Sequence, residues 1–299
     1  MTNPDRHKMS DLILTALAPA IWGSTYLVTT ELLPAGYPLT VAFLRALPAG
    51  LLLLLLGGQL PKGRWWGRIM VLGALNFSIF WTLLFVAAYR LPGGVAATLG
   101  AAQPLIVVFL ARLALGTAVR LVAVMAAIAG LAGVALLVLS PTAIALDPVG
   151  IVAGLGGALS MAAGTILTRK WQPKASLLTF TAWQLTAGGV LLLPLAFWFE
   201  PSLPPLTGRN IAGFAYLGLI GAAFTYFLWF RGIARLEPAG VATLGLFSPM
   251  TAVLLGWIVL GQGLGILQML GMGIVLVSVW LSQRPAQLKN SLPAAAFWR

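Results

Sequence analysis

Long apolar stretches, separated by short polar turns, run through almost the whole chain. Each is about 20 residues long, the length that an α-helix needs to cross the hydrocarbon core of a bilayer. An open strand would leave its backbone groups unpaired in lipid, so the stretches are predicted to be helices. Ten can be placed, at about 10–31, 38–57, 66–89, 93–112, 118–140, 148–170, 176–198, 209–231, 239–260 and 264–283.

The composition agrees with a chain that lies in a membrane. Sixty per cent of its residues are apolar and 8% are charged, whereas about a quarter of the residues of a soluble domain are charged. The first apolar stretch is too long for a signal-peptide core and is predicted to be a span. There is no cysteine, which excludes disulfides and thiol chemistry. The net charge of +12 does not indicate nucleic acid, because the basic residues lie in turns between spans.

The distribution of lysine and arginine predicts the orientation of the chain. The N-terminus, the even-numbered turns and the C-terminal tail hold fifteen of the eighteen, while the odd-numbered turns hold only Arg90 and Arg209. The remaining one, Arg45, lies inside the second span. By the positive-inside rule both termini are expected in the cytoplasm. We therefore expect a multi-pass protein of the bacterial inner membrane.

One segment of the chain occurs twice. Residues 90–104 and 235–249 agree, without a gap, at seven of fifteen positions and lie 145 residues apart. Five spans per repeat is an odd number, so the second repeat enters from the opposite side and the repeats are inverted. Pro104 and Pro249 end the two copies, and each is expected to bend its helix and act as a hinge. Paired interruptions of this kind indicate the substrate site of a transporter.

Several motifs make the chain resemble the drug/metabolite transporter superfamily, of the type with two EamA domains. They are Trp22-Gly23-Ser24-Thr25-Tyr26, Arg45, Ala-Thr-Leu-Gly at 97–100 and 242–245 with the prolines that follow, and the glycines at 130, 133, 271 and 273. The resemblance implies all-α architecture: ten transmembrane helices as two inverted five-helix repeats around a central cavity. The repeats would span 10–140 and 148–283, before a cytoplasmic tail at 284–299. Thr117 and Gln262 replace the glutamate common at the ends of spans 4 and 9, which puts a charged contact there in doubt.

The chain lacks the parts that an enzyme or an ATP-driven pump needs. Its only histidine, His7, is in the N-terminal tail, and its six acidic residues lie at helix ends or in turns. No Asp-rich motif and no phosphate-binding Gly-x-x-x-x-Gly-Lys-Ser/Thr loop is present. We therefore expect no enzymatic activity, no cofactor and no metal.

Polar and aromatic residues at membrane depth are the candidate site. The polar ones could equally make hydrogen bonds between helices, and the aromatic ones could pack or face lipid. Together they favour a cavity for a net-neutral, partly apolar solute, and they do not suit a phosphate ester. The candidate substrate-binding residues are Trp22, Asn76, Phe77, Phe80, Gln103, Met161, Trp183, Gln184, Phe247 and Ser248.

Arg45 has two interpretations. It could contact a carboxylate or form part of a gate. Alternatively, it could be structural, extending toward the surface or pairing with Glu31, the acidic residue nearest to its level. The sequence favours the structural interpretation.

These features predict a secondary transporter that exports small neutral metabolites by alternating access. Aromatic, apolar and other neutral amino acids are the expected substrates, in line with a resemblance to YddG-type exporters. An exporter of amphipathic drugs or other metabolites is an alternative, and a non-transporting membrane scaffold is another. The expected partners are the small-molecule substrate and the bilayer, without nucleic acid, and the expected state is a monomer. Without Asp, Glu or His between helix ends, transport down the substrate gradient is the simplest coupling, although sodium remains open.

Overall fold

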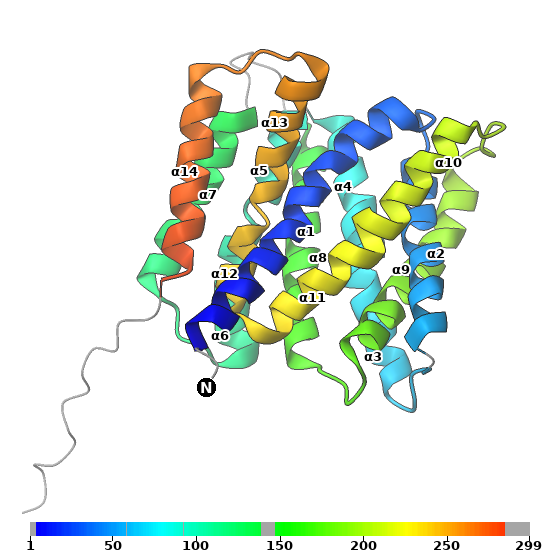
Figure 1. The fold of residues 1–299 in the computed structure, drawn as a ribbon, viewed down its shortest axis with the longest axis horizontal. Helices are drawn as coiled ribbons and strands as arrows, with labels where there is room; N and C mark the ends of the chain where they lie inside the picture. The colour runs from blue at the N-terminus through cyan, green and yellow to red at the C-terminus, as the bar shows by residue number, and fades with distance from the viewer. Residues whose placement is uncertain (1–3, 58, 92, 139–146, 285–299) are drawn as a thin grey trace, which may run out of the picture.

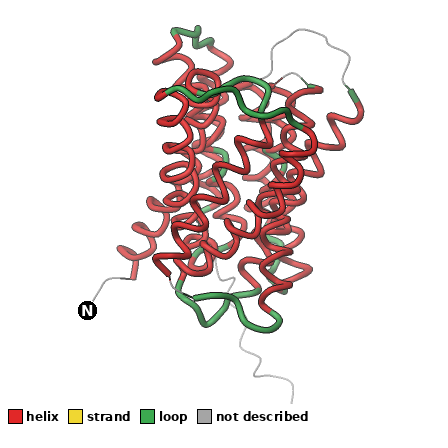
Figure 2. The backbone as a smooth tube through the Cα atoms, turned by 90° about the vertical axis from the view of Figure 1, so that its right-hand side faces the viewer, coloured by secondary structure: helices red, strands yellow, loops and turns green. Residues whose placement is uncertain are grey.

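The computed structural model describes residues 4–57, 59–91, 93–138 and 147–284, and the regular structure in them is helical. Within these residues, nine helical stretches are long and apolar enough to cross a membrane, and α14 (Ile266–Ser282) is a shorter apolar helix. Figures 1 and 2 show them as a bundle of tilted helices. The prediction of an all-α protein with ten membrane helices is confirmed. The predicted tail beyond Arg284 lies outside the described residues.

Both repeats are built from the same sequence of elements. We call the side of the bundle on which α1 begins and α14 ends the terminal side, and the opposite side the far side. The first repeat comprises α1 (Pro4–Leu32), α2 (Pro38–Gly57), α3 (Trp65–Gly73), η1 (Ala74–Ser78), α4 (Ile79–Arg90), α5 (Gly93–Gly100), α6 (Gln103–Leu115) and α7 (Leu121–Val138). The second comprises α8 (Pro148–Lys170), α9 (Leu177–Phe199), α10 (Gly208–Ala215), η2 (Tyr216–Phe224), α11 (Thr225–Arg235), α12 (Pro238–Leu244), α13 (Phe247–Leu260) and α14.

Two spans in each repeat are not regular α-helices. The third and eighth spans contain the π-helical segments η1 and η2. The fourth and ninth spans are interrupted, because α5 ends at Gly100 before α6 begins, and α12 ends at Leu244 before α13 begins. Pro104 and Pro249 lie in the first turns of α6 and α13, where proline is tolerated. Each interruption therefore lies within one of the two repeated segments, residues 90–104 and 235–249.

Helix contacts follow a reciprocal pattern. α2 packs along α9, and α7 along α14, so spans 2 and 5 each contact their own counterparts, spans 7 and 10. Likewise, α4 packs on α8 as α11 packs on α1. Small residues allow the close approach: a Cβ added at Gly50 of α2 would lie 2.4 Å from the backbone nitrogen of Thr186 in α9. A reciprocal pattern is what a twofold relation between the repeats produces.

Candidate substrate site

A group of six aromatic side chains packs together where α1, η1, α4 and α11 meet. The ring centroid of Tyr226 lies 4.9 Å from that of Trp22 and 4.6 Å from that of Phe77, and Phe77 lies 5.3 Å from Trp81. Trp22 also contacts Trp229 at 5.2 Å. Tilted and edge-on pairs such as these are the favoured aromatic geometries. We call this group the central aromatic cluster; it consists of Trp22, Phe77, Trp81, Tyr226, Trp229 and Phe230.

Helical spacing brings the members of this cluster together. Residues three or four apart lie on one face of a helix. Tyr226, Trp229 and Phe230 therefore share a face of α11, and Phe77 and Trp81 share a face where η1 continues into α4. All five are at most 5% exposed, while Trp22 of α1 is half-buried. The cluster therefore belongs to the main hydrophobic core of the bundle.

A short hydrogen-bond chain adjoins the cluster at the π-helical segment η2. The indole N–H of Trp22 donates to the hydroxyl of Thr225 at 2.9 Å. That hydroxyl donates to the carbonyl of Gly221 at 2.8 Å, and Nη2 of Arg45 donates to the same carbonyl at 2.6 Å. The guanidinium of Arg45 also lies 5.2 Å from the ring centroid of Trp81. A π-helical segment interrupts the usual backbone pattern and is often found at functional sites.

The other repeat makes the corresponding contact with neutral groups. The amide nitrogen of Asn76, in η1, donates to the side-chain oxygen of Gln184 at 2.8 Å and to the hydroxyl of Thr168 at 3.1 Å. Asn76 and Gly221 are 145 residues apart, the offset of the repeated segment. Gln184 follows Arg45 by 139 residues, the offset at which Leu178-Thr179 repeats Leu39-Thr40. Thus span 2 reaches η2 through a charged side chain, while span 7 reaches η1 through an amide.

Five further predicted residues lie next to the cluster or at the helix interruptions. Met161 is 3% exposed and belongs to the same hydrophobic core, on which Phe80 and Phe247 also pack. Gln103 begins α6, and its amide nitrogen is buried without a hydrogen-bond partner. Ser248 lies in the first turn of α13, and its carbonyl oxygen would be 2.6 Å from a Cβ added at Gly23 of α1.

Trp183 lies apart from the other predicted residues. Its indole N–H donates to the carbonyl of Gln59, in the turn between α2 and α3, at 2.7 Å. It packs with Trp65 and Phe180 in a separate hydrophobic core. The sequence predicts Trp183 as a substrate-binding residue together with Trp22, and the structure does not bring the two together. A residue one position from Gln184 faces another side of the helix, which the sequence alone did not resolve.

Neither structural interpretation of Arg45 describes its surroundings. Glu31 is exposed, and no ion pair joins Arg45 to any acidic residue in the part of the chain that the structure describes. Arg45 is 9% exposed, so it does not extend to the surface. The expected pairing with Glu31 is therefore corrected. The side chain of Arg45 points inward, where it donates a hydrogen bond to the carbonyl of Gly221 and lies over the ring of Trp81.

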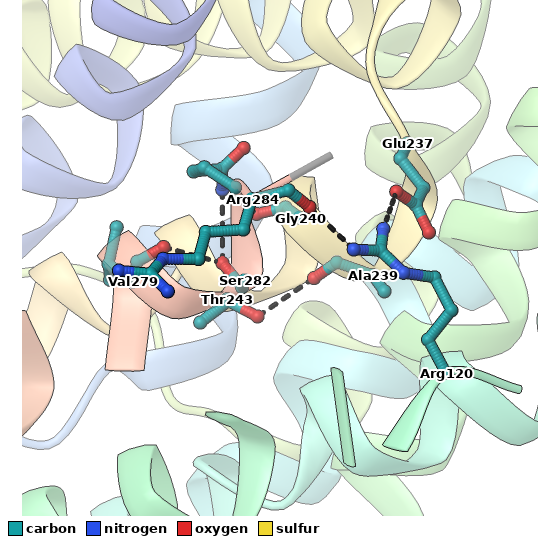
Figure 3. Close-up of polar contacts among 9 residues, drawn as sticks. Arg120, Glu237, Ala239, Gly240, Thr243, Val279, Ser282 and Arg284 are labelled. Carbon is teal, nitrogen blue, oxygen red and sulfur yellow. Dashed lines mark hydrogen bonds and ion pairs between the residues drawn. The ribbon is translucent and has the colours of Figure 1, made fainter. Parts of the chain in front are cut away.

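Ionic and polar contacts join the repeats on the terminal side. Arg120 pairs with Glu237 at 2.8 Å and also donates to the carbonyl of Arg284, as Figure 3 shows. Asp11 of α1 pairs with Arg231 of α11 at 2.5 Å. On this side α6 also packs against α12. We call these contacts the terminal-side polar layer.

Polar contacts also join the repeats on the far side. Both carboxylate oxygens of Glu200 accept backbone N–H groups at the start of α2, from Leu39 at 2.6 Å and Thr40 at 2.7 Å. Arg90 pairs with Asp147, the N-cap of α8, at 2.9 Å. The hydrogen bond from Arg90 lowers the pKa of the Asp147 carboxyl below its usual range, and a bond from the backbone N–H of Val149 adds to this.

Sequence reasoning left Thr225, Tyr226 and Trp229 out of the candidate site, together with the carbonyl of Gly221. A signal for two of these positions was available, because the 145-residue offset continues backward into the third and eighth spans. It pairs Trp81 with Tyr226 and Asn76 with Gly221. Within the described residues, no group of three or more histidine, aspartate or glutamate side chains could hold a metal ion.

Comparison with known proteins places this arrangement in a family. The sequence model of the EamA-like transporter family matches residues 9–139 and 148–283. The chain belongs to the EamA-like transporter family. It is 45% identical to Protein PecM of Dickeya dadantii (strain 3937) over 268 residues, which cover 89% of this chain and 90% of that protein. It is 30% identical to the inner membrane transporter YedA of Escherichia coli (strain K12) over 283 residues, which cover 92% and 91%.

A solved structure shares the fold of this EamA-like transporter. A crystal structure of another protein superposes with a TM-score of 0.79 at 18% identity, over 92% of this chain and 96% of that chain. At that identity the likeness supports the fold alone. Family membership and the apolar helices together make the chain a multi-pass membrane transporter, and the family is one of transporters rather than enzymes.

Proposed function

We propose that this transporter exports small neutral metabolites, above all aromatic and apolar amino acids, as YddG-type exporters do. The observation that carries the proposal is the central aromatic cluster, which places ring faces beside a few hydrogen-bonding groups inside an apolar bundle. Binding sites for small molecules are typically apolar, with a small number of polar groups that fix orientation. The proposed orientation has both termini in the cytoplasm of a bacterial cell, with the monomer as the transporting unit.

Alternating access is supported by where the irregular segments lie. Interruptions in spans 4 and 9 divide each span into two rods, with Gln103 and Phe247 at the start of the second. Discontinuous helices at corresponding places in two repeats are typical of transporter sites. The terminal-side polar layer joins α1, α7, α11 and α12, and these contacts would separate to admit a substrate from the cytoplasm. Pro104 and Pro249 are the proposed hinges.

Transport without ion coupling is the simplest mechanism for these residues. A proton-coupled carrier usually needs an acid or histidine within the membrane whose charge changes during the cycle. The sequence predicts the acidic residues at helix ends or in turns, and the structure corrects this for Asp11, which lies inside α1. Its carboxylate is held by Arg231 and Arg235 on the terminal side, and Arg45 keeps its proton at physiological pH. High cytoplasmic substrate concentration would then drive export.

The proposal is tested by counterflow in proteoliposomes loaded with L-phenylalanine. We expect labelled phenylalanine to enter without any ion gradient, and neither a pH gradient nor a sodium gradient to drive accumulation. Trp22→Ala should reduce the initial rate about tenfold, because it removes a ring contact and the bond to Thr225. Trp198→Ala is the matched control, since Trp198 is 85% exposed at the end of α9.

Three results would separate this proposal from its alternatives. Concentrative uptake under a pH gradient would contradict uncoupled transport. Counterflow of amphipathic cations without any amino-acid flux would favour a drug exporter. Absence of flux for every compound tested, in a protein that melts cooperatively, would favour a scaffold.

A further inference from the structure

Arg45 is a buried charge whose hydrogen-bonding capacity is largely unused. A guanidinium carries five N–H donors. The structure gives Arg45 one hydrogen-bond acceptor, the Gly221 carbonyl, and leaves its Nε–H buried without a partner. No acidic side chain in the described residues pairs with it, and 9% of the residue is exposed. The positive charge is therefore offset only by a carbonyl and by the ring of Trp81.

A purely structural role would not need this charge. A charged group in the interior of a membrane protein is costly, and such residues usually mark a pathway for substrate or ions. In the second repeat a neutral side chain makes the corresponding contact: the amide of Gln184 bonds to Asn76 in the π-helical segment η1 of the first repeat. Each of the two residues has one buried nitrogen without a partner, Nε of Arg45 and Nε2 of Gln184. What distinguishes Arg45 from its counterpart is therefore its positive charge, beside the central aromatic cluster.

We propose that Arg45 binds the carboxylate of the transported substrate while the rings of the central aromatic cluster contact its apolar body. This inference rests on the proposed transport function and narrows the substrate to organic carboxylates with an aromatic or apolar body. The contacts run in sequence from the charge into the rings: Trp81 lies 5.2 Å from the guanidinium, and Tyr226 lies 6.4 Å from Trp81. Trp22 follows at 4.9 Å from Tyr226. The Nε–H that lacks a partner supplies a charge-assisted bond to a carboxylate oxygen.

The same observations indicate that the amino group of an amino acid contributes less to binding than its carboxylate. Within the described residues, no carboxylate pairs with Arg45 or with the cluster. Asp11, inside α1, is held by Arg231 and Arg235 on the terminal side, and the other acidic residues are at helix ends or in turns. Recognition therefore depends on the carboxylate. A carboxylic acid without an amino group should bind, whereas the matching amide should not.

Two small molecules of nearly equal shape test this in the purified full-length protein. 3-Phenylpropionate carries the carboxylate, and 3-phenylpropionamide replaces it with a neutral amide. In nanodiscs at pH 7, tryptophan fluorescence titration should give a dissociation constant for the acid about ten- to hundredfold lower than that for the amide. Arg45→Gln, which copies the residue of the second repeat, should abolish this preference, and Arg45→Lys should keep part of it. Arg90→Gln, which removes a surface arginine, should retain it fully.

The outcomes distinguish this inference from the proposed function. Equal binding of acid and amide by the wild-type protein would overturn it, even if Arg45→Gln did not fold. An Arg45→Gln protein that folds and still prefers the acid would also overturn it. Absence of binding for both compounds would contradict a site for aromatic carboxylates. If the acid binds through Arg45 but no amino acid is transported, the inference holds and the amino-acid proposal fails.

Discussion

Residues at corresponding positions of the two repeats have different surroundings in this protein. Arg45 and Gln184 are counterparts in the two repeats, yet one meets a backbone carbonyl and a tryptophan face, and the other meets an amide and a hydroxyl. The difference lies at Gly221, which has no side chain, and at its counterpart Asn76, which has one. Of these two corresponding positions, only the one in the first repeat, Arg45, carries a charge.

Glu200 provides a prediction at this scale. Its carboxylate accepts two of the free N–H groups at the start of α2, and an acidic group at a helix N-terminus is favoured by the helix dipole. Glu200→Gln removes the charge and one acceptor, and should lower stability by about 1 kcal/mol. Thermal unfolding of the purified protein measures the change.

The control for this prediction is Glu31→Gln, at an exposed glutamate that also lies on the far side. It should melt like the wild-type protein. Equal melting of the Glu200→Gln and Glu31→Gln variants would show that the two backbone bonds contribute nothing measurable.

Much of the site could be predicted from residue type, but its grouping could not. Polarity and aromaticity at membrane depth selected Trp22, Phe77 and Gln184, which lie at buried contacts. Which of the other residues lie together depends on the side of the helix that each occupies. Trp183 bonds to Gln59 in the turn between α2 and α3, whereas Tyr226 packs in the central aromatic cluster. In helices that are apolar on every side, sequence periodicity gives little information about which face is inward.

Some elements of the bundle can be predicted from the sequence and others cannot. The interruptions of spans 4 and 9 follow from Pro104 and Pro249, which cannot continue a helix interior without losing a backbone bond. The π-helical segments η1 and η2 carry no such signal, since each consists of ordinary helix-compatible residues. Their register is set by the packing around them, which includes the bond from Ser160 to the carbonyl of Leu75 and that from Arg45 to Gly221.

Close packing of α2 on α9 gives a prediction at the scale of elements. A Cβ at Gly50 would lie 2.4 Å from the backbone nitrogen of Thr186, and backbone cannot move aside as a side-chain end can. Gly50→Ala should therefore force the helices apart and lower the melting temperature of the protein by several degrees. In α14, a Cβ at Gly273 would meet nothing within 4 Å.

Gly273→Ala is the matched control, because it makes the same chemical change in a helix. Alanine is favoured over glycine within helices by about 1 kcal/mol, so this variant should melt at or above the wild-type temperature. A Gly50→Ala protein that also melted at the wild-type temperature would contradict the close approach of α2 and α9.

At the scale of the whole molecule, the duplication determines the architecture. Spans 2 and 7 contact each other, and so do spans 5 and 10, so each repeat packs against its counterpart through two pairs of helices. The sequence predicted inverted repeats, because the number of spans in a repeat is odd and the repeated segment needs no gap, but it did not predict which spans contact each other. It gave no account of the contacts that close the terminal side, because ion pairs such as Asp11–Arg231 join residues 220 positions apart.

The proposed orientation has a direct test. Reporter domains fused after Glu31, Asp147 and Leu203 should be periplasmic, and fusions at Lys62, Lys174 and the C-terminus should be cytoplasmic, because the basic turns remain inside. Alkaline phosphatase and green fluorescent protein fusions give complementary readouts. A periplasmic C-terminus would contradict the orientation and with it the expected direction of export.

The unequal lengths of the outer helices have a consequence for the surrounding lipid. The apolar part of α1 runs over 25 residues, or about 38 Å, whereas the 17 residues of α14 extend over about 26 Å. A bilayer core is about 30 Å thick. The long helix can fit by inclining, and Figure 1 draws α1 at an angle to α14, whereas α14 is about 4 Å shorter than the hydrocarbon core. This hydrophobic mismatch is relieved where the membrane thins, so short-chain lipids should be enriched around α14.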